Sequence, residues 1–160
     1  MSAPERSARV ITDPNALPAR IGTPYPPHLN APCAERVRRA LGNAAGIKAF
    51  GVNLTELPAG AWSSQRHWHT EQDEFIYVLE GEITLVTNAG ETLLTAGMCA
   101  GFPAGAPDGH HLINKSGKRA LYLDIGDRPA GDAAHYPDVD MAASYETASK
   151  FTRRNGEAFE

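Results

Sequence analysis

The sequence predicts one all-β domain, and three observations support this fold class. The chain has 160 residues, a length that suits a single domain with one core. Short runs rich in Val, Ile, Thr, Tyr and Phe occupy residues 47–125 and are separated by glycines, which is typical of many short strands. Some runs, such as residues 75–79, are apolar on both faces. That pattern indicates two sheets wrapped round each other, or a partner that covers the outside.

The positions of the prolines and glycines divide the chain into three segments. Residues 1–46 hold most of the prolines and predict an extended N-terminal arm, with one short helix over residues 34–41 where Val37, Ala40 and Leu41 have helical spacing. Residues 47–126 form the central domain, and the polar, turn-rich residues 127–160 predict an irregular C-terminal tail. The strands that we expect in the central domain cover residues 47–57, 64–69, 74–80, 82–87, 91–95, 110–114 and 119–125.

Composition and charge exclude several classes of protein. The 15 Lys and Arg residues against 19 Asp and Glu residues give a net charge of −4, so we expect no nucleic-acid partner. Arg36, Arg38 and Arg39 form a short cluster that we expect to be a solvated face. No apolar run reaches the roughly 20 residues that span a bilayer, and no apolar stretch follows the charged start, so we expect a cytoplasmic protein without a membrane contact. Two widely spaced cysteines, Cys33 and Cys99, are expected to be buried and unpaired.

The histidines carry the chemical signal. His67 and His69 alternate along a strand, so they project from one face with about 6.5 Å between their Cα atoms. Glu74 opens the next strand, and a reversal of the chain brings its carboxylate beside the two imidazoles. A further ligand from elsewhere in the sheet would complete a metal site, and a later strand begins with His110 and His111. Asn114 lies on the face of His110.

These residues resemble the two motifs of the cupin family. The first motif is matched by Gly60, His67, His69, Glu74 and Gly81, and the second by Gly97, Pro103, Gly105, His110 and Asn114. Four residues instead of the usual two separate Gly105 from His110, so His111 stays open as the alternative ligand. Other segments are similar to a bacterial single-domain (type 2) subgroup that is described as sugar-phosphate-isomerase-like.

The resemblance implies a double-stranded β-helix, which is a small jelly-roll barrel with a metal in its lumen. It implies that His67, His69, Glu74 and His110 bind one divalent transition metal ion, with Asn114 supporting them. Three imidazoles and a carboxylate suit Fe, Mn, Ni, Co or Zn, and the ligand types do not choose among these metals.

Catalytic residues are less defined than the metal ligands. Tyr122 and Asp124 share one face of the strand over residues 119–125, and they become candidates for proton transfer only if that face looks inward. We expect the opposite, with the apolar face in the core. Arg66 alternates away from His67, and Lys115 and Lys118 lie at a turn, so the sequence offers no phosphate site.

Two functions follow. The first is a metal-dependent cupin enzyme that acts on a small polar oxygenated substrate as an isomerase, dioxygenase or lyase. The alternative is a non-catalytic cupin that binds or senses a metal or a small molecule. The doubly apolar strands and the Pro-rich arm predict a homodimer in either case.

Overall fold

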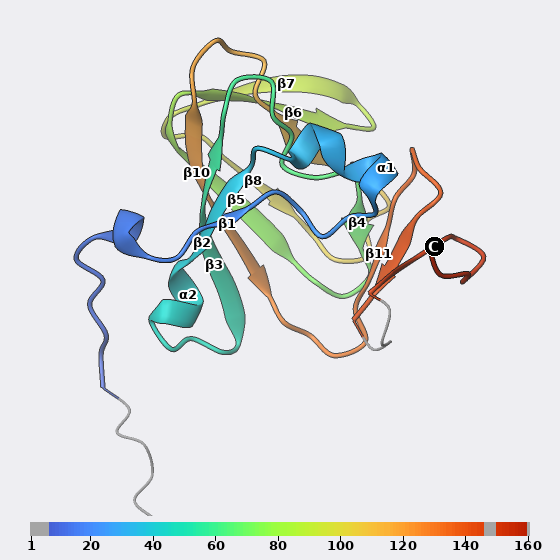
Figure 1. Ribbon diagram of the computed structural model, residues 1–160, viewed down its shortest axis with the longest axis horizontal. Coiled ribbons are helices and arrows are strands. Elements are labelled where there is room, and N and C mark those ends of the chain that lie inside the picture. Colours follow the sequence, from blue (N-terminus) through green and yellow to red (C-terminus); the bar gives the residue numbers. More distant parts are fainter. Residues whose placement is uncertain (1–6, 146–149, 160) are drawn as a thin grey trace, which may run out of the picture.

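The computed structural model describes residues 7–145 and 150–159, and antiparallel strands make up most of its regular structure (Figure 1). The all-β fold class is therefore confirmed. Helices are confined to the short segments α1 (Pro27–Asn30), α2 (Leu41–Ala44) and the 3-10 turns Pro14–Ala16 and Ala31–Cys33. The strands are β1 (Arg20–Ile21), β2 (Val37–Ala40), β3 (Phe50–Leu57), β4 (Trp68–His69), β5 (Glu74–Glu80), β6 (Glu82–Thr87), β7 (Gly90–Thr95), β8 (Cys99–Phe102), β9 (His111–Ile113), β10 (Ala120–Asp127), β11 (Ala133–His135), β12 (Ala142–Ser144) and β13 (Phe151–Thr152).

The strands of the described residues are arranged in three sheets. The largest has six strands in the order β1-β2-β3-β10-β5-β8, and a three-stranded sheet has the order β7-β6-β9. The four-stranded sheet β13-β12-β11-β4 connects the C-terminal segment to the strand that carries His69. β10 is central because it pairs with β3 on one side and β5 on the other, which places Tyr122 between Thr55 and Val78. Because residues directly opposite one another in a sheet point to the same face, the buried side chains of Thr55, Tyr122 and Val78 all lie on its inward face.

The expected helix over residues 34–41 is wrong. Residues 37–40 form β2, which pairs with β3 from Val37 opposite Glu56 to Ala40 opposite Asn53, and α2 begins only at Leu41. A helix of so few residues is barely stable on its own. The backbone hydrogen bonds that this segment makes with β3 therefore decide its conformation. β1 extends the same edge, with Arg20 opposite Arg38.

The core has two parts. The larger lies between the sheets and includes the completely buried side chains of Leu57, Val78 and Ile83. Each large apolar side chain that is fully buried contributes about 1.5–3 kcal/mol to folding. The smaller part joins the chain ends, because Tyr25 and Cys33 pack with Tyr136, Met141 and their neighbours. Figure 1 shows the N-terminal segment (blue) and the C-terminal segment (red) side by side near α1.

The outer surface differs from expectation at one cysteine. Cys33 is buried as expected, whereas Cys99 is exposed on β8, which is an edge strand of the six-stranded sheet. The outer face of β5 carries the apolar side chains of Phe75, Tyr77 and Leu79, which are 39%, 39% and 42% exposed.

In the described part of the chain, no helix has the length and apolarity to cross a membrane.

Candidate metal centre

Three neighbouring segments bring the proposed ligands together. His69 ends β4, and His67 forms an isolated antiparallel bridge with His110 just before β9. Reciprocal backbone hydrogen bonds of 3.1 and 2.9 Å hold the His67 and His110 main chains together. Glu74 opens β5 from the inward face that also carries Ile76 and Val78. The two sequence motifs therefore meet in space.

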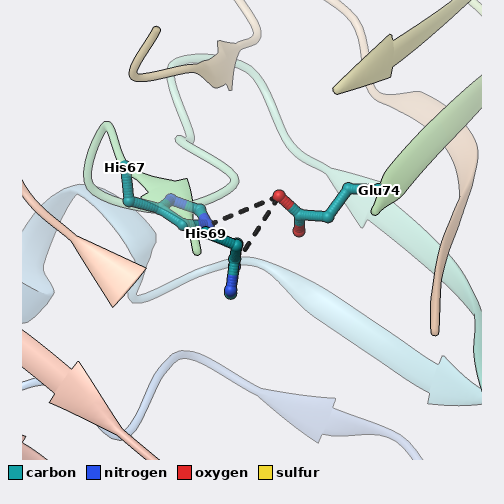
Figure 2. Close-up of side chains that lie close together, drawn as sticks. All are labelled: His67, His69 and Glu74. Atoms are coloured by element: carbon teal, nitrogen blue, oxygen red, sulfur yellow. Dashed lines mark ion pairs between the residues drawn. The ribbon is translucent and has the colours of Figure 1, made fainter. Parts of the chain in front are cut away.

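The imidazoles face one carboxylate oxygen. Oε2 of Glu74 lies 2.8 Å from Nε2 of His110, 3.7 Å from that of His69 and 3.9 Å from that of His67. Candidate ligand atoms of His67, His69 and Glu74 all lie within 4.8 Å of one another. Figure 2 shows both of these imidazoles beside the Glu74 carboxylate, joined to it by the dashed lines. One small cation could contact all of these atoms.

The opposite nitrogens of two imidazoles are already bonded. His67 donates from Nδ1 to the Gln65 carbonyl at 2.8 Å, and His69 donates from Nδ1 to Oδ2 of Asp132 at 2.6 Å. A proton on Nδ1 leaves the lone pair on Nε2, which is the atom that faces Glu74. Histidine ligands of metals are held in this way by a carbonyl or a carboxylate behind the ring. The donor set therefore fits a divalent transition metal.

Asp132 was missed by the sequence analysis. It lies in the loop before β11 and also accepts hydrogen bonds from the backbone amides of Glu71 and Gln72 at 3.0 and 3.2 Å. Burial would raise the pKa of Asp132, but these amides and His69 outweigh it, so the pKa is lower than usual. An isolated aspartate far along the chain from the H-x-H motif carries no local signal for this role.

His110 and His111 occupy different surroundings. The ring of His110 stacks on Phe102 with centroids 3.7 Å apart, and its Nε2 faces Glu74. His111 instead directs Nδ1 to the Ser64 carbonyl at 2.9 Å, and its ring meets the edge of Trp62. Adjacent residues of an extended chain point to opposite sides, so one of the two histidines joins the cluster and the other lies away from it.

Protonation at neutral pH suits metal binding. Burial lowers the pKa of His67 to about 4, so its imidazole is neutral. Burial alone would raise the pKa of Glu74, but the hydrogen bond from His110 and the nearby imidazoles lower it to about 2. Neutral imidazole and ionised carboxylate are the forms that coordinate a cation.

The expected outward orientation of Tyr122 and Asp124 is wrong. Tyr122 is 1% exposed, and burial raises the pKa of its phenol. Asp124 accepts hydrogen bonds from Asn53 and Thr55 at 2.7 and 2.6 Å. The inward face of β10 contributes Tyr122 to the core and Asp124 to the polar lining of the cavity, while Leu123 and Ile125 lie opposite Tyr77 and Phe75 of β5. Both residues line the same cavity as the cluster.

Asn114 does not support the cluster as expected. Its side-chain amide donates to the Leu57 and Lys118 carbonyls at 2.7 Å each, and its oxygen accepts from Ser116. The completely buried Asn114 therefore fixes the turn before β10 to β3. Asn114 belongs to the second motif, but its side chain stabilises this buried turn. Its hydrogen bonds to described residues do not reach the cluster.

A cavity of about 300 Å³ adjoins the cluster. Its volume lies at the lower end of the range for small-molecule sites. Arg66 points away from it to Asp138, as the sequence predicts, and Lys115 pairs with Glu91. The predicted solvated face at Arg36 and Arg38 is wrong, because Arg36 is buried just before β2, Arg38 lies in β2, and both side chains line the cavity.

Comparisons with known proteins agree with this fold. The profile of the cupin domain matches residues 53–126. A cupin-superfamily sugar phosphate isomerase from Silicibacter pomeroyi shares 43% identity over 92% of this chain and 95% of its own, with a TM-score of 0.86. A protein proposed to be a sugar phosphate isomerase, from Acidithiobacillus ferrooxidans, shares 30% identity over 80% of this chain and 76% of its own, with a TM-score of 0.67.

A more distant structure shows the fold alone. The polyketide cyclase of Streptomyces resistomycificus is 19% identical over 89% of each chain, with a TM-score of 0.63. Among curated proteins no match was found. The expected double-stranded β-helix is confirmed by the sheet order and by these structures.

Proposed function

This chain belongs to the cupin family, and from that membership we propose that it is a metal-dependent protein that acts on a small polar oxygenated substrate. The observation that carries the proposal is the convergence of three imidazole Nε2 atoms on the Glu74 carboxylate at the wall of a cavity. A cluster beside a cavity gives a small molecule access to whatever the cluster holds.

We propose His67, His69, Glu74 and His110 as the ligands, with His110 preferred to His111 because its Nε2 lies 2.8 Å from Glu74. Fe, Mn, Ni, Co and Zn all accept this donor set, so the metal is one of these. When bound, such an ion polarises a substrate oxygen or acidifies a water. Asp132 orients the His69 ring through Nδ1, and Phe102 fixes the plane of the His110 ring.

The reaction class is open between isomerase, dioxygenase and lyase, since one fold and one metal cluster serve many chemistries. The isomerase names of the two more similar solved relatives make phosphorylated sugars the first substrates to test. Tyr122 and Asp124 face the same cavity and are the candidate groups for moving a proton to or from a substrate.

The alternative is a cupin that binds a metal or small molecule without catalysis. One experiment separates the two functions. Elemental analysis of protein purified without added metal identifies the ion, and the protein loaded with that ion is then screened against sugar phosphates, hydroxy acids and phenolic acids. Turnover that disappears in His69→Ala supports the enzyme. Tight ligand binding without turnover by any of these substrates supports the binding protein.

We also propose a cytoplasmic homodimer. The apolar side chains of Phe75, Tyr77 and Leu79 on the outer face of β5 support association, because a second copy would remove them from water. The two unpaired cysteines suit a reducing compartment. Sedimentation equilibrium at micromolar concentration tests the dimer, and a stable monomer would contradict it.

The division of the chain is likewise a proposal. In this proposal, residues 47–126 are the barrel domain, residues 1–46 its N-terminal arm and residues 127–160 its C-terminal tail. Limited proteolysis checks this division, because cleavage outside residues 47–126 should precede cleavage within them.

A further inference from the structure

The cavity beside the cluster has an excess of positive charge. Among the described residues, its lining contains two carboxylates, Glu74 and Asp124. Glu74 is engaged by the histidines, and Asp124 is engaged by Asn53, Thr55 and Arg38. The cationic side chains of the lining are more numerous, and they are Arg20, Arg36, Arg38, Arg128 and Lys150.

Arg36 is the least compensated of these cations. It is 5% exposed, and its two Nη atoms donate to the neutral carbonyl oxygens of Gly22 and Ser63. Its Nε is buried and has no hydrogen-bond partner among the described residues. A buried guanidinium without an anion is costly, because carbonyl dipoles satisfy its donors but do not neutralise its charge.

Arg38 lies in β2, two residues after Arg36, and both side chains line the cavity. One Nη of Arg38 lies 3.2 Å from Asp124, but its Nε is also buried and unpartnered within the described part of the chain. Arg20 stands opposite Arg38 on β1. The edge of the six-stranded sheet therefore presents three arginines on the face that looks into the cavity.

Lys150 adds a cation from the opposite end of the chain, just before β13. Its Nζ lies over the rings of Tyr145 and Phe151, 5.0 and 5.2 Å from their centroids. Burial lowers its pKa, and repulsion from the three arginines lowers it further, so the four charges are close enough to interact. No carboxylate of the described residues pairs with Lys150.

From this arrangement we propose that Arg36, Arg38 and Lys150 form an anion subsite, which binds a phosphate or carboxylate group of a small molecule in the cavity. This inference rests on the proposed function in one respect: the rest of the bound molecule would extend toward the His/Glu cluster, which lines the same cavity. Arginine and lysine donors that lack a protein acceptor are suited to an oxyanion, and Arg20 at the more exposed edge attracts it.

Anion binding is measured by calorimetry with three probes: inorganic phosphate, malonate and glucose 6-phosphate, with glucose as the neutral comparison. The variants are Lys150→Met and Arg38→Gln, with Lys118→Met, on an exposed turn, as the matched control. Circular dichroism checks that each variant is folded. Loss of one charged donor should weaken binding by about tenfold or more, while Lys118→Met should bind as the wild type does.

The His69→Ala variant separates this proposal from the metal. Phosphate bound to a metal ion would lose affinity in His69→Ala, whereas phosphate bound to the cationic subsite would keep it. Binding of phosphate and glucose 6-phosphate, but not malonate, assigns the subsite to phosphate, and preference for malonate assigns it to carboxylate. Failure of all three anions to bind, or equal affinity in Lys150→Met, Arg38→Gln and the wild type, would overturn the subsite even if the metal is confirmed.

Discussion

Nδ1 of His69 lies 2.6 Å from Oδ2 of Asp132, and each of these side chains is only 4% exposed. The carboxylate keeps the imidazole proton on Nδ1, so Nε2 is available on the side of Glu74. Asp132→Asn should lower the affinity for the metal by about 10- to 100-fold, as is typical when the group behind a histidine ligand is removed. Competition with a chelating indicator measures this. Asp138→Asn, on an exposed carboxylate paired with Arg66, is the control and should bind metal normally. Equal affinities in the two variants would refute the role of Asp132.

His69→Ala should reduce the metal content sharply, because it removes one of four proposed ligands. The metal-to-protein ratio after dialysis, from elemental analysis, is the readout. His28→Ala serves as the control, since His28 is exposed and its ring lies beside that of Phe159, away from the cluster. Unchanged stoichiometry in a folded His69→Ala protein would remove His69 from the site.

His110→Ala and His111→Ala should differ. The first variant loses metal because it removes the imidazole beside Glu74, whereas the second keeps the metal and loses some stability because its ring packs against Trp62. Metal content and urea unfolding of both proteins distinguish the two effects. Metal loss in His111→Ala alone would reverse the assignment.

Gly81→Ala should destabilise the fold. Gly81 has φ of +78°, and an added Cβ would meet the Arg119 carbonyl oxygen at 2.8 Å. The left-handed conformation alone costs an alanine about 1–2 kcal/mol. Gly117→Ala is the matched control, because open space surrounds Gly117 and its φ lies outside the left-handed region. Urea unfolding should show a clear loss in the first variant and a change within about 0.5 kcal/mol in the second. Similar urea midpoints for the two variants would contradict the expectation that a side chain at position 81 strains the backbone.

The two thiols should react differently with a thiol reagent at pH 8. Burial raises the pKa of Cys33 to about 11, so about one thiol in a thousand is ionised there, while Cys99 is exposed on β8. One equivalent should react in native protein and two in urea. Because the folded pKa of Cys33 exceeds that of an unfolded thiol, its contribution to stability is present below about pH 8.5 and declines as the pH rises toward 11. Two rapidly labelled thiols in native protein would show that Cys33 is accessible.

The central strands could be predicted from the sequence, whereas the edges of the sheet could not. Alternating runs of β-branched and aromatic residues located β5 and β6 with their observed bounds. β2 was mistaken for a helix because four residues can satisfy either periodicity, and only pairing with β3 decides between them.

The site likewise has a part that the sequence predicts and a part that it does not. His67, His69 and Glu74 are near one another in sequence, so their proximity followed from strand alternation, and the family resemblance supplied His110. Asp132 reaches the cluster, and Arg36 and Lys150 reach the cavity, through long-range contacts that no local pattern reveals. The sequence does not reveal the inward face of β10, because apolar residues are usually expected inside, whereas Tyr122 and Asp124 face a cavity with many polar side chains.

The contact between the strand of the cluster and the segment after residue 126 bears on how the protein is made. β4 pairs with β11, and Tyr136 stacks on His67 with the ring centroids 5.4 Å apart. A nascent chain that ends at residue 126 already contains every proposed metal ligand, but it lacks Asp132 and Tyr136. The hydrogen bond from His69 to Asp132 and the stacking of Tyr136 on His67 therefore form only after the segment that follows residue 126 has been made. During translation, a metal ion would meet a site whose His69 ring is not yet held.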